Sequence, residues 1–205
     1  MTGREKQKIV FASKNKGKIR ELTALLEEVD FDLLSLHDYP DAPSIREDGR
    51  TFRENALKKA RAIAEYTGEI VIADDSGLEV DSLGGAPGVH SARYSGTGAT
   101  DERNISKLLK TMEGIPPGER GAVFRCVLVL YETDGTYEIF EGELRGTISQ
   151  RPSGSGGFGY DPVFIVSKYG VTVAELDPAT KNRISHRGIA FAKLKKNLRG
   201  RVEQQ

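Results

Sequence analysis

Two adjacent carboxylates, Asp74 and Asp75, follow a run of four apolar residues and precede Ser76-Gly77. Three of the four apolar residues are β-branched, and a short apolar run that ends at a turn signal is typical of a buried strand. We therefore expect the acids at the C-terminal end of a strand, where open α/β sheets bind ligands. Because side chains alternate along a strand, the two acids should point to opposite sides. A carboxylate in this place suits Mg²⁺, and the alternative is a helix N-cap or turn aspartate.

A second polar segment, Ser-Lys-Asn-Lys-Gly-Lys at residues 13–18, joins a predicted strand to a predicted helix. Backbone N–H groups at a helix N-terminus and a nearby lysine form a ready anion site. Ser13 and Asn15 can donate hydrogen bonds to phosphate oxygens, and Lys18 adds a positive charge. The G-x-x-x-x-G-K-[ST] pattern of a Walker A loop is absent. The segment is thus either a phosphate-binding loop of another type or an ordinary polar loop.

Residues 154–159 match G-x-G-x-x-G letter for letter, but a dinucleotide fingerprint must follow a strand and open a helix. Tyr160-Asp161-Pro162 and an apolar strand follow here instead, which argues against a Rossmann site. We interpret the segment as a flexible loop whose glycines let the backbone approach a ligand. Phe158 is then presented for stacking on a base, and plain core packing of this ring is the alternative.

A basic segment, Lys-Asn-Arg-Ile-Ser-His-Arg-Gly at residues 181–188, lies at a predicted helix start. Positive charges there oppose the helix dipole, which favours a functional role in recognising an anion or a carbonyl group. His37, His90 and His186 lack metal-site spacing such as H-E-x-x-H, and a G-x-S-x-G motif is absent. A zinc hydrolase and a serine hydrolase are therefore disfavoured.

The elements that position these residues alternate between strand and helix in the first half of the chain. Thr51 and Glu54 form a capping-box pattern, Asp134-Gly135 indicates a hairpin turn, and Gly200 is placed to cap the last helix. The predicted helices cover residues 16–29, 51–66, 101–112 and 185–198. The predicted strands cover residues 8–13, 31–36, 70–73, 121–131, 136–145 and 163–166. The pattern predicts an α/β fold in which helices flank a long mixed sheet.

The composition sets broad limits on the function. The chain has 205 residues, with 30 basic and 30 acidic side chains that cancel, so no global field attracts nucleic acid or a membrane. Cys126, the only cysteine, lies in an apolar run and excludes a disulfide framework. We find no signal peptide and no apolar stretch that could span a bilayer. We expect a soluble, cytoplasmic protein that binds neither nucleic acid nor membranes.

Five segments, taken in their order, resemble the inosine/xanthosine triphosphate pyrophosphatase family over nearly the whole chain. They are Ser13-x-Asn15-x-x-Lys18, residues 73–78, residues 83–94 (Leu-Gly-Gly-Ala-Pro-Gly-Val-x-Ser-Ala-Arg-Tyr), residues 156–162 and residues 184–187. The resemblance implies a Mg²⁺-dependent homodimer that hydrolyses ITP, dITP and XTP to the monophosphate and pyrophosphate. It also implies a single domain over residues 1–205, with two lobes and a central active-site cleft.

The resemblance further implies roles for individual residues. Asp75 is the catalytic acid–base and a metal ligand, and Glu47 is the best candidate for a second metal ligand. The implied substrate-binding residues are Ser13, Lys14, Asn15, Lys16, Gly17, Lys18, Ser76, Phe158, Gly159, Tyr160, Asp161, Lys181, His186 and Arg187. Two departures are visible: the family usually carries Thr-Gly in place of Ser13-Lys14, and Arg46 interrupts the acidic segment near Glu47.

Two other functions remain as alternatives. A kinase or phosphoryl transferase is disfavoured because the Walker A and kinase signatures are absent. A non-catalytic nucleotide- or RNA-binding protein is disfavoured because a phosphate site without a metal gains nothing from buried negative charge. A pyrophosphatase assay with ITP and Mg²⁺ separates the three functions.

Overall fold

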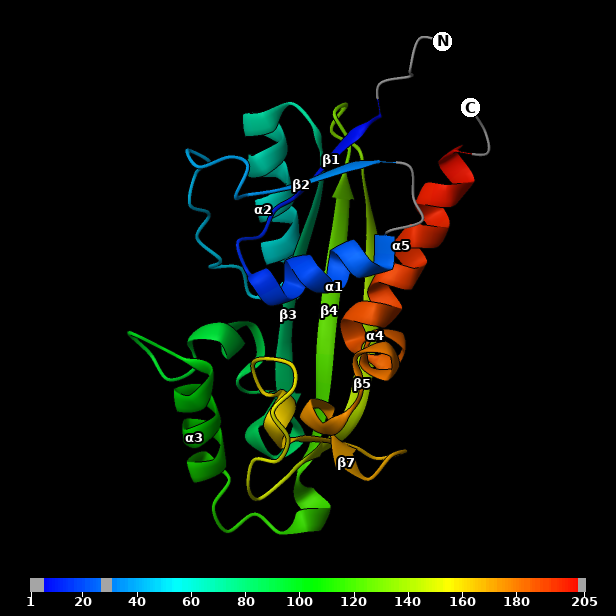
Figure 1. Ribbon diagram of the computed structural model, residues 1–205. Coiled ribbons are helices and arrows are strands. Elements are labelled where there is room, and N and C mark those ends of the chain that lie inside the picture. Colours follow the sequence, from blue (N-terminus) through cyan, green and yellow to red (C-terminus); the bar gives the residue numbers. More distant parts are fainter. Residues whose placement is uncertain (1–5, 27–30, 203–205) are drawn as a thin grey trace. The chain divides into compact units, whose positions relative to one another are not determined.

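The computed structural model describes residues 6–26 and 31–202, and Figure 1 shows its elements. The helices are α1 (Lys16–Leu26), α2 (Phe52–Thr67), α3 (Asp101–Thr111), α4 (Pro178–Ile184) and α5 (His186–Val202). The strands are β1 (Lys8–Phe11), β2 (Asp32–Ser35), β3 (Ile70–Val80), β4 (Gly121–Tyr131), β5 (Tyr137–Ile148), β6 (Phe164–Val166) and β7 (Val171–Thr172). None of the described helices is long and apolar enough to cross a membrane.

The strands form one seven-stranded sheet in the order β2-β1-β3-β4-β5-β6-β7. β1 pairs in parallel with β2 and β3, whereas β6 pairs antiparallel with β5 and β7. The predicted α/β class and the mixed sheet flanked by helices are therefore confirmed. The hairpin prediction also holds, because β4 and β5 are neighbours and Gly135 takes the left-handed φ of 88° between them.

The chain divides into two compact units. The first unit takes its described residues from 1–75, 127–141 and 190–205, and the second comprises 76–126 and 142–189. Each unit carries part of the predicted site, and the boundary falls between Asp75 and Ser76. The central cleft that the resemblance implies stays a prediction.

The prediction that β3 ends at the acids is wrong. The strand continues through Asp74 and Asp75 to Val80, so both carboxylates lie inside it. Gly77 does not take the left-handed conformation of a turn glycine, and beyond it Leu78 and Val80 are fully buried. Because apolar alternation resumes at these positions, burial extends the strand past the Ser-Gly pair that reads locally as a turn.

Helix α2 follows its sequence signals closely. The Thr51 side chain accepts the Glu54 N–H, and Gly68, with φ of 70°, ends the helix by donating to the Ala64 carbonyl. The capping box is only half formed, because the Glu54 carboxylate accepts the Arg50 N–H at 2.7 Å. The buried face of the helix includes three alanines, Ala56, Ala60 and Ala64. Helix α1 begins as predicted, but its predicted end falls at residues 27–29, outside the described residues.

The C-terminal part differs from its prediction in two ways. A short helix, α4, precedes α5, and Ser185 separates them by accepting the Gly188 N–H at 3.0 Å. Gly200 does not cap α5, which continues to Val202. Gly200 does not take a left-handed φ, so the backbone reversal that a C-cap glycine provides does not occur there.

The second unit has its own apolar core. Phe124 stacks on Phe164 with ring centroids 4.3 Å apart, and Leu108 of α3 and Met112, the C-cap residue of this helix, are fully buried. This core supports the segment from Tyr160 onward, because Tyr160 belongs to the same cluster. The residues that follow the glycine-rich segment are thus fixed by packing rather than by local sequence.

Gly188 allows α5 to pass close to α4. An added Cβ would overlap the Asn182 carbonyl oxygen, which is backbone and cannot easily move aside. We expect Gly188→Ala to reduce the free energy of unfolding by roughly 1–3 kcal/mol through overpacking. Gly200→Ala, on the same helix, meets open space and should leave stability equal or slightly raised. Thermal unfolding of both variants checks this, and equal melting temperatures would contradict it.

Candidate functional site

Asp75 lies at the centre of the polar group in the first unit. Its side chain is 6% exposed, and Asn55 of α2 donates from Nδ2 to Oδ2 of Asp75 at 2.9 Å. Asn55 is itself fully buried and accepts the Gly49 N–H at 2.7 Å, so it ties the loop before α2 to the carboxylate. Burial raises the pKa of Asp75 to about 6, although the Asn55 hydrogen bond opposes the shift. The result is a fixed carboxylate that titrates near neutral pH.

Asp74 and Glu47 bind two different lysines. Asp74 is 1% exposed and forms an ion pair with Lys18 at 2.7 Å, whereas Glu47 pairs with Lys59. Burial alone would lower the pKa of Lys59, but the carboxylates of Asp74 and Glu47 outweigh it and the pKa is raised. Lys59 is therefore an ammonium group that interacts with three carboxylates, because Asp75 also contributes.

The sequence reasoning missed both Asn55 and Lys59. They stand four residues apart on α2, on a side of the helix that otherwise carries buried alanines. A buried asparagine has to form hydrogen bonds, so a polar pair that interrupts an apolar stripe is the signal that could have found them.

The loop of residues 13–18 is organised by its own side chains. Ser13 is nearly buried and accepts the Asn15 N–H at 3.2 Å. Asn15 accepts the N–H groups of Gly17 and Lys18 at 2.9 and 3.1 Å, so two of the donors expected to bind an anion are occupied. Lys14 and Lys16 are exposed. The side-chain groups of this loop that can donate to a phosphate are the Ser13 hydroxyl, the Asn15 amide NH₂ and the lysine ammonium groups.

Asp75 and Glu47 are the two residues for which binding of a divalent cation is predicted, and both carry carboxylate oxygens. Among the described residues, no three His, Cys, Asp or Glu side chains gather as a ready-made metal cage. Mg²⁺ does not need one, since it is commonly bound by one or two carboxylates together with waters and substrate phosphates. The burial that raises the pKa of Asp75 also favours a cation beside it, because a positive charge stabilises the ionised form. The oxygen donors therefore fit Mg²⁺.

In the second unit, Phe158 is half-buried beneath two cations. The Lys181 Nζ lies 4.9 Å from the centre of its ring, and the Arg187 Cζ lies 4.4 Å from it. Both side chains are buried, at 8% and 5% exposure. Lys181 also forms an ion pair with Asp161 at 2.9 Å, and Asp161 accepts the Phe158 N–H at 3.0 Å. Four of the predicted substrate-binding residues thus form one connected cluster.

His186 and Arg187 are linked to this cluster. The His186 ring stacks on Phe124 at 4.7 Å, and its Nε2 lies 3.1 Å from Nη1 of Arg187. A guanidinium group can only donate, so Nε2 is the acceptor and a neutral ring carries its proton on Nδ1. His186 and Arg187 are the first two residues of α5. They belong to the basic segment whose positive charge opposes the helix dipole.

Tyr160 and Ser76 occupy supporting positions. Tyr160 is 5% exposed and donates its hydroxyl to the Ser91 carbonyl at 2.9 Å. Burial raises its pKa, which keeps the hydroxyl protonated. Ser76 is half-buried on β3, directly after Asp75. Direct substrate contact by these two residues stays a prediction.

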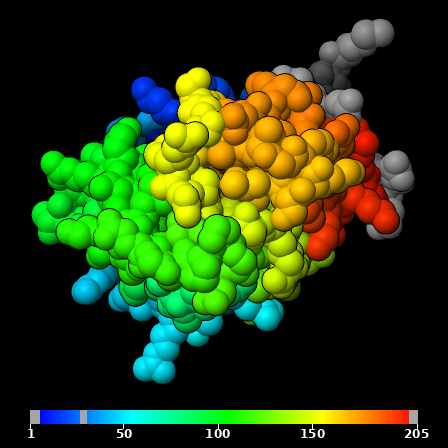
Figure 2. Space-filling model, turned by 90° about the horizontal axis from the view of Figure 1, so that it is seen from below, coloured from blue at the N-terminus to red at the C-terminus, as the bar shows by residue number. Residues whose placement is uncertain are grey.

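Three of the four glycines in residues 154–159 serve the protein's own packing. An added Cβ would clash with the Ala174 backbone at Gly154 and Gly156, and with the Asp161 carboxylate at Gly157. A short 3₁₀ turn and β6 follow the segment, which confirms that it is not a dinucleotide fingerprint. Figure 2 shows this segment (yellow) at the surface, next to the region that carries α3 (green).

Comparisons with known proteins agree with this arrangement. The model of the Ham1 family matches residues 9–197. The dITP/XTP pyrophosphatase of Geobacter sulfurreducens is 54% identical over 93% of this chain and 96% of that protein. The dITP/XTP pyrophosphatase of Shigella flexneri is 49% identical over 94% of this chain and 98% of that protein.

Solved structures agree as well. A HAM1 protein from Coxiella burnetii superimposes with a TM-score of 0.88 at 43% identity, over 95% of this chain and 99% of that chain. The Ham1 protein of Staphylococcus aureus gives a TM-score of 0.86 at 40% identity, over 95% and 100% of the two chains. The family match, the identities and the fold lead to one conclusion: the chain belongs to the Ham1 family.

Proposed function

We propose that the protein hydrolyses non-standard purine nucleoside triphosphates, namely dITP, XTP and ITP, to the monophosphate and pyrophosphate. The observation that carries the proposal is the buried Asp75, held by Asn55 and titrating near neutral pH. A general base works best when its pKa lies near the operating pH. Relatives that cover nearly the whole chain are dITP/XTP pyrophosphatases, which supports the substrate class.

The first unit supplies the groups for phosphate chemistry. Asp75 orients a water molecule and accepts its proton as the water attacks the α-phosphate. Lys18, with the Ser13 hydroxyl and the Asn15 amide, holds the distal phosphates and offsets their negative charge. Asp75 and Glu47 would hold Mg²⁺, which neutralises the charge of the departing pyrophosphate when bound. Lys59 forms an ion pair with Glu47 and holds that carboxylate in place.

The second unit supplies the groups for base recognition. The Phe158 ring offers a stacking surface, which is worth about 1–3 kcal/mol per base. Hypoxanthine and xanthine present an acceptor at O6 and a donor at N1, whereas adenine presents an amino group and a bare N1. Arg187 can only donate, so it pairs with O6 and meets another donor in adenine. Lys181 and Asp161 hold the Phe158 backbone and ring in place.

Hydrolysis in ¹⁸O-labelled water tests the position of bond cleavage. With dITP and Mg²⁺, we expect the label in dIMP and none in the pyrophosphate, because the water attacks the α-phosphate and pyrophosphate leaves. Mass spectrometry of both products gives the answer. Label in free orthophosphate, with dIDP accumulating, would identify an ordinary nucleotide phosphatase and end this proposal.

Two further properties belong to the proposal. The family resemblance implies a homodimer, which sedimentation equilibrium would show as a mass of twice 22.5 kDa. A nucleotide-pool enzyme has to meet nucleoside triphosphates where they are used, which favours the cytoplasm.

A further inference from the structure

Both peptide groups that flank Phe158 are held by carboxylates. The N–H of Phe158 donates to Oδ2 of Asp161 at 3.0 Å, and the N–H of Gly159 donates to Oδ2 of Asp101 at 2.7 Å. Fixing the peptide planes on either side of a residue restrains its φ and ψ, and with them the direction of its Cα–Cβ bond. Two carboxylates, those of Asp161 and Asp101, therefore hold the backbone that carries the Phe158 ring. Asp161 belongs to the predicted site. Asp101 does not, and it lies 58 residues before Gly159 in the chain.

Asp101 is the first residue of α3, and α3 is well anchored. Asn104 accepts the Ser95 N–H at 2.8 Å and donates to the Ala92 carbonyl at 3.3 Å. Lys107 donates to the Tyr94 carbonyl at 2.6 Å, and Leu108 is fully buried. Because the helix is fixed at several points, its first residue is a firm support for the Gly159 peptide.

Capping of α3 does not explain Asp101. The N-cap is Thr100, whose hydroxyl accepts the Arg103 N–H. Glu102 supplies a second acid in the first turn, so the helix dipole is offset without Asp101. Among the described residues of this turn, Asp101 is the one that accepts a hydrogen bond from the Gly159 N–H.

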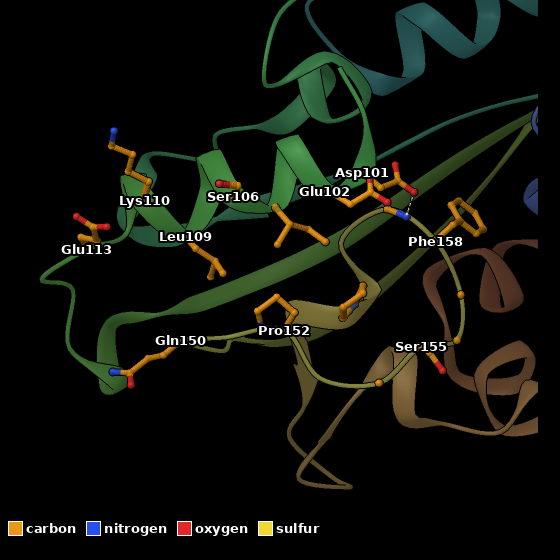
Figure 3. Close-up of a pocket in the computed structure, with 16 residues that line it drawn as sticks. Asp101, Glu102, Ser106, Leu109, Lys110, Glu113, Gln150, Pro152, Ser155 and Phe158 are labelled. Carbon is orange, nitrogen blue, oxygen red and sulfur yellow. Dashed lines mark hydrogen bonds between the residues drawn. The ribbon is translucent and has the colours of Figure 1, made fainter. Parts of the chain in front are cut away.

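Figure 3 shows where this contact lies. A groove of about 810 Å³ runs between α3 and the glycine-rich segment, and the hydrogen bond from Gly159 to Asp101 crosses from one side to the other. Away from this bond, the groove separates the segment from the helix. Asp101 is consequently the point through which α3 can hold the Phe158 backbone.

We propose that Asp101 is a positioning residue for base recognition: through the Gly159 peptide it holds the Phe158 ring in the orientation that stacks on the purine. This role rests on the proposed function. It acts through Phe158 without contact to the phosphates, so its loss should weaken nucleotide binding and leave the chemical step nearly intact.

Three variants isolate the hydrogen bond. Asp101→Ala removes the acceptor, and Asp101→Asn keeps an oxygen that can accept the Gly159 N–H. Glu102→Ala is the matched control, because it also removes one negative charge from the first turn of α3 but has no bond to the segment. Any general effect of charge on a polyanionic nucleotide is therefore the same in Asp101→Ala and Glu102→Ala.

Steady-state kinetics with dITP give the functional result. We expect Asp101→Ala to raise KM about tenfold, equivalent to about 1.4 kcal/mol, with kcat changed less than about threefold. Asp101→Asn and Glu102→Ala should both stay within about threefold of wild type in KM. A fall in kcat with KM unchanged, or an equal rise in KM for Glu102→Ala, would refute the positioning role.

Amide hydrogen exchange gives a second result that does not depend on activity. In ¹⁵N-labelled protein, the Gly159 amide should exchange about tenfold faster in Asp101→Ala and at the wild-type rate in Glu102→Ala. An unchanged rate in Asp101→Ala would show that the bond does not hold the segment and would overturn the proposal. If wild type hydrolysed none of dITP, XTP and ITP, the proposed function would fail, and with it the assignment of Asp101 to base recognition. Unchanged KM in an active Asp101→Ala would overturn the Asp101 role alone.

Discussion

Asp75→Asn should abolish most of the pyrophosphatase activity and at the same time make the metal-free protein more stable. The amide is nearly the same size as the carboxylate and can still accept the hydrogen bond from Asn55. It cannot accept a proton from water and is a poor ligand for Mg²⁺. Loss of a general base costs about 10²–10⁴-fold in kcat, and the loss of metal binding adds to this. Steady-state assays with dITP and Mg²⁺ measure the effect.

The gain in stability follows from the pKa of Asp75. Burial raises it to about 6 in the folded protein, from 3.8 as the ordinary value. Below about pH 3 the carboxyl is protonated in both the folded and the unfolded chain, so it costs nothing. Between about pH 4 and 6 the unfolded chain ionises first, and the wild type loses stability. Above pH 6 the carboxyl is ionised in the folded protein as well, and the loss of stability is complete. The Asp75→Asn side chain does not ionise, so the variant does not lose this stability.

We therefore expect Asp75→Asn to exceed wild type by on the order of 2–3 kcal/mol in free energy of unfolding at pH 7, with EDTA present. The difference should vanish at about pH 3, below both pKa values. Urea denaturation at the two pH values measures it. A variant that is less stable at pH 7 would show that the ionised carboxylate is well solvated.

Asp74→Asn is the comparison for the catalytic part. Asp74 pairs with Lys18, so its replacement should chiefly weaken substrate binding by freeing the lysine to move. If Asp74→Asn abolished turnover while Asp75→Asn kept most of its kcat, the roles assigned to the two acids would be reversed.

Arg187→Ala should reduce kcat/KM for ITP much more than for ATP. The guanidinium is buried, sits over Phe158 and is linked to His186, where its donors can pair with O6 of the base. A hydrogen bond from a charged group is worth about 1.5–3 kcal/mol, or roughly 10–150-fold. ATP offers this guanidinium no acceptor at position 6 of its base, so hydrolysis of ATP should change less than tenfold. The ratio of the two kcat/KM values measures base discrimination.

Arg183→Ala is the matched control for this prediction. Arg183 is an exposed cation near the end of α4, in the same basic segment. Its removal should change hydrolysis of ITP and ATP equally and only slightly. Equal large losses on both substrates in Arg187→Ala would assign Arg187 to the phosphates instead. Circular dichroism of the variant confirms that the helix start is intact.

The sequence by itself determined the parts of this protein that depend on neighbouring residues. Thr51 and Thr100 begin helices because their hydroxyls accept an N–H three residues later, a contact that needs no distant partner. Gly135 turns a hairpin because its own φ is positive. The apolar runs of β1, β3 and β4 and the alanine stripe of α2 predicted the layered α/β class. Five motifs in order predicted the family.

Tertiary structure alone decided how far β3 extends. Ser76 and Gly77 are locally a turn signal, yet the strand continues to Val80. It stays extended because Leu78 and Val80 are buried in the apolar core of the second unit. Gly200 is a second residue whose role the local sequence did not decide. A glycine ends a helix where its backbone takes a left-handed φ, and Gly200 does not take one.

The hydrogen-bond partners and the burial of the site residues could not be predicted from the sequence either. Asn55 and Asp75 are 20 residues apart and Asp101 and Gly159 are 58 apart, and no local pattern encodes either hydrogen bond. The raised pKa of Asp75 follows from burial, which is a property of the packed protein rather than of the Asp-Asp pair. Residue types and spacing therefore predicted which groups do the chemistry. Packing decided what holds them and at which pH they ionise, because both depend on contacts between distant segments.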